Sequence, residues 1–242
     1  MSTIAIIAAL DRELAPLVRD WQAGSFSHNG RNFRAYQKGD VVAMAGGIGP
    51  ATAARAARAV ADHYKPQLLI SAGLAGALLH TLKVGSVLTP NVIIDAATAN
   101  EYRCDTGGGV LVTAGEIAGT RSKRELVEKF HALAVDMEAA AVADVARDEK
   151  MGFRCVKAIS DEADFVMPPL SQFVDQEGNF QTRRFAAWTA IRPQYWSRTL
   201  VLARNSKRAS KALCDWLRKN VGDGQSDAVV RIERAQMSRT NS

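Results

Sequence analysis

The sequence predicts an α/β fold in which one sheet is covered by helices on both faces. Two observations lead to this prediction. Apolar runs of strand length alternate with segments of helical periodicity through the first two thirds of the chain. In addition, 242 residues with 47% hydrophobic and 23% charged side chains are enough for one large globular domain with a full core.

The expected strands are short apolar runs rich in Val, Ile and Ala. The run at 84–95 is long enough to bend. We expect strands at residues 4–10, 41–45, 67–71, 84–95, 110–113 and 153–160.

Three helices are expected between these strands. The first follows the glycine turn 46–49 and runs from Pro50 to His63, since proline is favoured in a first turn. A short second helix begins at Ser122, because Ser122 and Glu125 have the spacing of a capping box. The third is an Ala-rich segment from Met137 to Lys150.

The chain after residue 164 has a different character. Pro168 and Pro169 interrupt it, a turn is expected at 175–179, and helices are expected to resume near Arg183 and Pro193. Apolar residues between 195 and 217 predict an amphipathic helix or a helix pair. We therefore expect one catalytic domain over 1–221, of which 165–221 is a basic helical extension. A mobile polar tail is expected at 222–242.

Charge is concentrated in that extension. The net charge is +6, and residues 183–219 contain ten Lys or Arg side chains but a single acid, Asp215. Such a segment suits an anionic lipid surface, nucleic acid or an acidic partner, and it is equally compatible with a solvated helix face. No apolar run approaches the roughly 20 residues of a membrane span, and no secretory signal is visible. The expected location is therefore cytoplasmic.

Three carboxylates lie where strands end or helices begin. Asp161 follows the strand at 153–160, Glu13 follows the first strand, and Glu138 opens the Ala-rich helix. Open α/β sheets bind ligands at the carboxyl ends of their strands, so these acids indicate an active site more than a binding module. Two structural alternatives remain, because Asp161 can act as a helix N-cap and Glu138 can interact only with the helix dipole or face solvent.

Six segments resemble, in the same order, motifs of the purine nucleoside phosphorylase and nucleosidase superfamily. The resemblance covers residues 4–164 and is strongest to the 5′-methylthioadenosine/S-adenosylhomocysteine nucleosidase branch. It implies a three-layer α/β/α sandwich with a central mixed twisted sheet. The six segments are Ile6–Glu13, Gly46–Gly49, Ser71–Gly76, Leu82–Ser86, Val135–Ala141 and Lys157–Asp164.

The resemblance also implies roles for particular residues. Asp161, oriented by Ser160, would donate towards N7 of the purine, and Glu13 would position and deprotonate the attacking water. Glu138 would accept hydrogen bonds from the ribose hydroxyls, and Met137 would pack against the sugar. In the central glycine motif, the substrate would meet Leu74, Ala75 and Gly76.

Hydrolysis is favoured over phosphorolysis. Many phosphorylases carry an arginine and a hydroxyl residue in the central glycine motif, where this chain has Ser71 and Leu74. Arg12 or Arg55 could replace the missing charge, and phosphate would then be a co-substrate. No other cofactor and no metal are expected, because the glycine turn matches no nucleotide fingerprint and the cysteines and histidines lack metal-ligand spacing. A non-catalytic nucleoside- or nucleic-acid-binding relative is the remaining alternative, and we expect no nucleic acid partner.

Several departures limit the resemblance to the nucleosidase branch. Leu74 replaces a serine, and the aromatic residue expected over the purine is missing, with Ile117 and Ala118 at the aligned positions. The part after residue 164 contains the segments Met167–Pro169, Arg192–Pro193 and Leu202–Asn205. In these segments it resembles another branch, the hopanoid-associated phosphorylases, thought to remove adenine from adenosylhopane. A basic helix with Trp196 and Trp216 could then lie on the inner face of a membrane, or its tryptophans could pack into the domain or a dimer. By resemblance, a homodimer or higher oligomer is expected.

Overall fold

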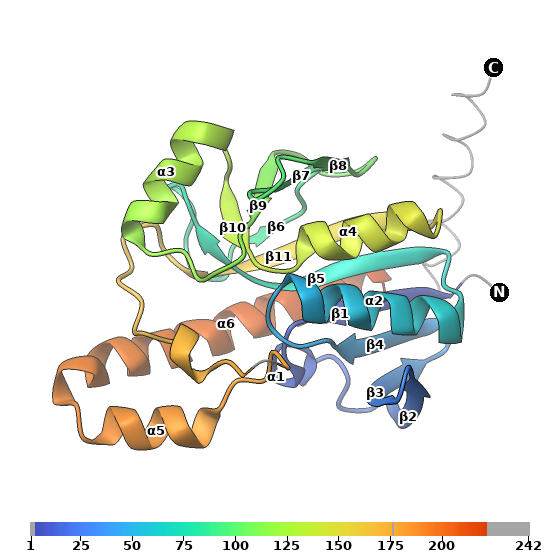
Figure 1. The fold of residues 1–242 in the computed structure, drawn as a ribbon, viewed down its shortest axis with the longest axis horizontal. Helices are drawn as coiled ribbons and strands as arrows, with labels where there is room; N and C mark the ends of the chain where they lie inside the picture. The colour runs from blue at the N-terminus through green and yellow to red at the C-terminus, as the bar shows by residue number, and fades with distance from the viewer. Residues whose placement is uncertain (1–2, 176, 222–242) are drawn as a thin grey trace.

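A mixed sheet forms the centre of the molecule (Figure 1). In the computed structural model, which describes residues 3–175 and 177–221, eleven strands belong to it. They are β1 (Ile4–Ala8), β2 (Gln22–His28), β3 (Arg31–Lys38), β4 (Val41–Ala45), β5 (Leu68–Ala77), β6 (Val87–Leu88), β7 (Val92–Asp95), β8 (Glu101–Arg103), β9 (Val110–Thr113), β10 (Ala134–Asp136) and β11 (Gly152–Asp161). The spatial order is β2-β3-β4-β1-β5-β10-β9-β7-β8, with β11 pairing to β5 and β6.

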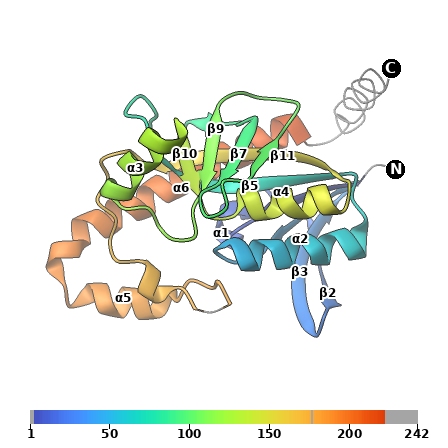
Figure 2. The same cartoon turned by 45° about the horizontal axis from the view of Figure 1, so that its top comes forward.

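The helices lie on both faces of this sheet (Figures 1 and 2). They are α1 (Asp11–Leu14), α2 (Pro50–Tyr64), α3 (Thr120–Phe130), α4 (Ala139–Asp148), α5 (Thr182–Ala190) and α6 (Trp196–Val221), with 3₁₀ turns η1 (Ser171–Phe173) and η2 (Pro193–Tyr195). Strand β1 shows why both faces are covered. Ile4 and Ile6 pack with Leu213 and Leu217 of α6, whereas Ala5 and Ile7 pack with α2 and α4. Successive side chains of a strand point to opposite faces, so a wholly apolar strand requires a helix layer on each side.

The predicted fold class is therefore confirmed, and several elements agree closely with the sequence. Strands β4 and β9 have the expected bounds, and α2 differs by one residue. The expected strand at 67–71 is longer, because β5 continues to Ala77 beside β11. The C-terminal segments also form as expected, with a hydrogen bond from the Gly178 amide to the Asp175 carbonyl closing the turn. The amphipathic segment is the single helix α6.

Other elements correct the sequence analysis. The expected strand at 84–95 is two strands, β6 and β7, separated at Thr89 and Pro90. Helix α3 begins at Thr120 after Gly119 with no side-chain cap, so the capping-box prediction at Ser122 was wrong. The hairpin β2–β3 and the short strands β8 and β10 were not predicted. The domain limit at 221 stays a prediction, and the tail at 222–242 lies outside the described residues.

The last helices extend away from the sheet. Both views show α5 and the first half of α6 reaching beyond its edge (Figures 1 and 2). The second half of α6 is buried through Leu213 and Leu217, whereas Leu200 is 68% exposed. In the described part of the chain, no helix has the length and apolar character that crossing a membrane requires.

Candidate active site

All the candidate site residues line one cavity of about 180 Å³ at the carboxyl ends of β5, β10 and β11. The segment that follows β1 and the start of α1 also line it, through Ala9, Leu10 and Arg12. The candidate residues in its wall are Glu13, Leu74, Ala75, Gly76, Met137, Glu138, Ser160 and Asp161. Side chains from both ends of the chain thus meet at the ligand-binding edge expected for an α/β sheet.

Asp161 is held from two sides at the end of β11. A register shift after Ile159 places Asp161 opposite Gly76 of β5. One carboxylate oxygen accepts the Ser160 hydroxyl at 2.8 Å, and the other accepts the ammonium of Lys123 at 2.6 Å. Asp161 is 1% exposed. The next helix along the described chain is η1, ten residues later, so Asp161 is not an N-cap.

Gly76 is required by the position of that carboxylate. A Cβ atom at Gly76 would lie 2.9 Å from Oδ2 of Asp161 and 3.2 Å from Cε of Lys123. A contact of 2.9 Å is shorter than real Cβ atoms show, so only glycine lets β5 approach the pair without a shift.

Glu13 lies in α1 with its carboxylate buried in the cavity wall. Its side chain is 4% exposed, and Oε2 has no hydrogen-bond partner among the described residues. Burial raises the pKa of Glu13 to about 7, although Lys157 and Arg12 partly offset this effect. A carboxylate that titrates near neutral pH is suited to act as a general base.

Glu138 is the N-cap residue of α4, and its side chain turns into the cavity. It accepts hydrogen bonds from the Gly49 amide at 2.9 Å and from the Met137 amide at 3.3 Å. Burial and the neighbouring Asp136 raise the pKa of Glu138 to about 7, against the effect of Lys157. Glu138 therefore does not face solvent, although its position at a helix start also suits the helix dipole.

Lys157 is a site residue that the sequence analysis did not identify. It lies on β11, is 1% exposed, and its ammonium is 2.7 Å from Asp136 and 3.1 Å from the Ser71 hydroxyl. Burial lowers the pKa of Lys157, but Asp136 and other neighbours raise it by more, so the pKa lies above its usual value. The signal was a lysine inside the apolar run 153–160. Lys123 was also missed, and its position in a polar helix carried no such signal.

The glycine turn before α2 has a structural explanation. A Cβ atom at Gly46 would lie 2.7 Å from Cβ of Ala56, so this glycine permits close packing of strand and helix. The turn also contributes to the site, because the Gly49 amide binds Glu138.

A second, apolar cavity of about 500 Å³ adjoins the first. Arg12, Ile48, Ile117, Leu170, Leu202 and Ser206 line both cavities. The remaining wall includes Phe180, Phe185 and Ala203 from α5, α6 and the segment before them. The extension after residue 164 therefore builds an apolar chamber beside the carboxylates.

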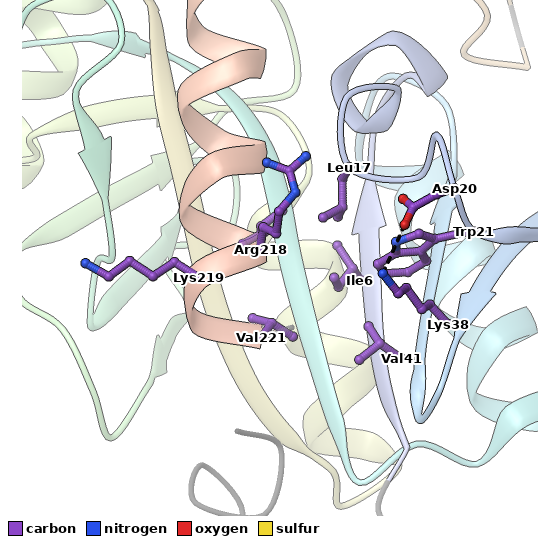
Figure 3. Close-up of a pocket in the computed structure, with 10 residues that line it drawn as sticks. Ile6, Leu17, Asp20, Trp21, Lys38, Val41, Arg218, Lys219 and Val221 are labelled. Atoms are coloured by element: carbon purple, nitrogen blue, oxygen red, sulfur yellow. Dashed lines mark hydrogen bonds and ion pairs between the residues drawn. The ribbon is translucent and has the colours of Figure 1, made fainter. Parts of the chain in front are cut away.

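Another hollow, of about 310 Å³, lies between the end of α6, β1 and β4 (Figure 3). Its charged side chains include Asp20 and Lys38, which pair at 3.0 Å, and Arg218. None of the candidate site residues lines it. In the described residues, no group of three His, Cys, Asp or Glu side chains is arranged to hold a metal ion. That no cofactor is used stays a prediction.

Known families and proteins are similar to this chain over much of its length. The family described as the phosphorylase superfamily matches residues 3–109 and 91–191. The 5′-methylthioadenosine/S-adenosylhomocysteine nucleosidase of Bacillus subtilis (strain 168) is 29% identical over 198 residues, covering 66% of this chain and 86% of that protein. The enzyme of the same name from Staphylococcus epidermidis is 25% identical over 197 residues, with the same shares.

Solved structures share the fold at lower identity. Futalosine hydrolase of Helicobacter pylori matches with a TM-score of 0.69 at 16% identity, covering 91% of this chain and 97% of that one. The S-adenosylhomocysteine nucleosidase of Streptococcus pyogenes, in complex with 5-methylthiotubericidin, matches with a TM-score of 0.68 at 20% identity, covering 91% and 96%.

Proposed function

This chain belongs to the phosphorylase superfamily, and we propose that it hydrolyses the N-glycosidic bond of an adenine-type purine nucleoside. One observation carries the proposal. Glu13, Glu138 and Asp161, which come from three distant parts of the sequence, line one cavity. A binding protein needs no base and acid around its ligand, whereas glycoside cleavage needs both. The nucleosidase relatives support the choice of substrate class.

The proposed reaction assigns one task to each carboxylate. The bond from the sugar C1′ to the base breaks, its electron pair leaves with the purine, and a proton reaches the base from the Asp161 side. Water attacks C1′ and gives its proton to Glu13, whose pKa of about 7 suits this task. Glu138 accepts hydrogen bonds from the ribose hydroxyls, and its charge stabilises the cation that develops on the sugar.

Phosphorolysis is the alternative reaction, but the site has few groups that could bind phosphate. Ser71 is 1% exposed and its hydroxyl accepts a hydrogen bond from Lys157, while Leu74 supplies no polar group. Of the two arginines that could bind phosphate, Arg12 lines the cavity and Arg55 does not.

Chromatography of products separates the two reactions. Methylthioadenosine, S-adenosylhomocysteine, adenosine and inosine are each incubated with and without phosphate. From an adenine nucleoside we expect free adenine without phosphate, and none from the Asp161→Asn variant. Release that requires phosphate would contradict hydrolysis and implicate Arg12.

The apolar cavity favours a second candidate substrate. Its wall is shared with the site, so a nucleoside with a bulky apolar 5′ substituent, such as a lipid-linked adenosyl compound of the adenosylhopane kind, could place that group between α5 and α6. A series of 5′-alkylthio adenosines tests this idea. For the native protein, kcat/KM should rise with the length of the alkyl chain on the substrate. In the Leu202→Glu variant, kcat/KM should no longer depend on that length. A fall with chain length would exclude the lipid-linked substrate.

We further propose that the extending arm, α5 with the first half of α6, contacts an anionic membrane surface. Ile191, Trp196, Leu200 and Val201 are exposed there by 42–76%, among basic side chains. Of Trp196 and Trp216, the two tryptophans considered for membrane contact, Trp216 packs against the core and Trp196 is exposed. Sedimentation with anionic vesicles should capture the native protein but not an Ile191→Asp/Leu200→Asp variant. Equal capture of both would exclude this surface. A homodimer or larger oligomer stays a prediction.

A further inference from the structure

The proposed reaction gives Lys123 no task except to hold the acid Asp161, yet the geometry of this lysine is unusual. Lys123 is the one buried residue of α3, a helix whose other side chains are exposed or half-buried. Its ammonium donates to Asp161 at 2.6 Å and to the Glu162 carbonyl at 3.0 Å. Amphipathic helices normally bury apolar side chains, so a lysine in this position points to a role in the cavity.

Both oxygens of Asp161 already accept hydrogen bonds. The Ser160 hydroxyl occupies Oδ1, and the Lys123 ammonium occupies Oδ2. In this arrangement the protons of both hydrogen bonds belong to the donors, and the carboxylate itself carries none. The proton that the leaving purine needs must then come from the neighbouring group that holds protons, and in this pair that group is the ammonium.

We propose that Lys123 is a positioning residue that also supplies the proton that Asp161 passes to the leaving base. An Nζ–H bond of Lys123 breaks as an O–H bond forms on Asp161, and this O–H bond breaks as an N–H bond forms on the purine. The base leaves neutral, Asp161 is again a carboxylate, and Lys123 is a neutral amine that regains a proton from solvent. This inference rests on the proposed function.

Other charged groups around the pair differ in their expected effect on pH dependence. Those that line the same cavity are Arg12 and Glu13 from α1, Glu116 from the segment before α3, Asp136 at the end of β10 and Glu138 at the start of α4. Behind them on β11, Lys157 pairs with Asp136, and Glu162 next to Asp161 pairs with Lys83. Glu13 and Glu138 must be charged to act, so they produce the acid limb of the activity profile. The fall of activity at high pH is then assigned to the group that donates the proton.

Two substitutions at one position separate proton supply from simple positioning. Lys123→Met removes the charge, whereas Lys123→Arg keeps it in a group that does not release its proton. Lys83→Met is the matched control, because Lys83 forms an exposed pair with Glu162, the residue next to Asp161, at 3.1 Å. The readout is kcat against pH for the adenine nucleoside that the native protein cleaves, with thermal unfolding to establish that each variant is folded.

We expect kcat to fall about a hundredfold or more in both Lys123 variants at pH 8, with their alkaline limbs moved to lower pH. Lys83→Met should behave as the native protein does. If Lys123→Arg kept the native rate and profile, the charge alone would suffice and the proton supply would be excluded. Unchanged kcat in Lys123→Met would exclude both roles.

A chemical rescue provides a second test if the arginine side chain does not fit at position 123. Lys123→Cys should be inactive, and alkylation with 2-bromoethylamine should restore activity by rebuilding an ammonium at the same place. This thioether amine releases its proton more readily than lysine does, so the restored alkaline limb should lie below the native one. Restoration at the native limb would contradict the inference. Absence of cleavage by the native protein would instead contradict the proposed function.

Discussion

Two buried lysines organise the carboxylates of the site. Lys157 pairs with Asp136 at 2.7 Å, and Lys123 pairs with Asp161 at 2.6 Å. Glu13 has no such partner, and its pKa of about 7 follows from burial. The fold thus pairs one acid with a buried lysine and raises the pKa of another acid by burial. Such different environments are how enzymes separate acid and base tasks.

The acid limb of activity is predicted from the two raised carboxylates. Glu13 and Glu138 both titrate at about 7, and both must be charged to act as base and sugar ligand. kcat should therefore rise with pH through about 7, and the midpoint belongs to the pair because the two groups interact. A kcat profile that is flat from pH 5 to pH 8 would contradict the assignment of the base.

The same burial predicts an unusual stability effect at Glu13. Its pKa rises from 4.5 to about 7 on folding, so the folded state holds the proton more tightly than the unfolded chain. This contribution is fully present below pH 4.5 and is lost as pH rises through 7. Glu13→Gln should thus stabilise the protein at pH 8 by up to about 3 kcal/mol relative to its effect at pH 4.5.

Urea unfolding of both proteins at the two pH values measures that difference. The same variant should lose hydrolysis by about a hundredfold or more at pH 8. A variant that is more stable but inactive fits a catalytic base whose burial in the charged form lowers the stability of the fold. Equal stability differences at both pH values would show that Glu13 is not buried in its charged form.

At the scale of elements, strands β5, β10 and β11 carry most of the site. Their register brings Gly76 opposite Asp161 and Gly76 opposite Val135. The Lys157–Asp136 pair then connects β11 to the end of β10. This arrangement predicts two effects that depend on neighbouring strands.

Lys157→Met should destabilise the fold. It leaves Asp136 buried and unpaired, which costs about 3–5 kcal/mol in comparable pairs. The double variant with Asp136→Asn should recover much of that loss, because no charge is left alone. Urea unfolding of the two single variants and the double variant measures the coupling, and additive losses would contradict a direct ion pair.

Gly76→Ala should reduce activity by about a hundredfold while the fold is kept, because its Cβ would displace the acid or its lysine by a fraction of an ångström. Gly24→Ala in β2 is the control, since a Cβ atom there meets nothing within 4 Å. Circular dichroism and kcat are measured for both. Full activity of Gly76→Ala would mean that the Asp161–Lys123 geometry tolerates movement.

Sequence patterns predicted the strands of four or more residues that are buried on both faces, and they missed exposed strands and strands of three residues. Strands such as β1 and β4 are apolar on both faces and were found, whereas β2 is mostly exposed and carries no such run. The capping box expected at Ser122 does not form, because the helix already begins at Thr120. Lys123, in the first turn of this helix, lies in the wall of the cavity. Local spacing cannot predict a contact between residues 123 and 161.

At the scale of the whole molecule, the site lies where the sheet meets the C-terminal arm. The carboxylates were predictable because each stands at an element end, and resemblance assigned their roles. The apolar cavity was not, because its wall combines residues from 12 to 210 that only the fold brings together. The same holds for Lys123 and Lys157, whose neighbours are distant in sequence.

The central claim is that this molecule hydrolyses a purine N-glycosidic bond by means of Asp161 and Glu13. Product chromatography with an adenine nucleoside, in phosphate-free buffer, tests it most directly when the native protein, Asp161→Asn and Glu13→Gln are compared. The claim predicts free adenine and a free sugar from the native protein and neither from the two variants. Adenine release only after phosphate is added, or equal release by all three proteins, would contradict it.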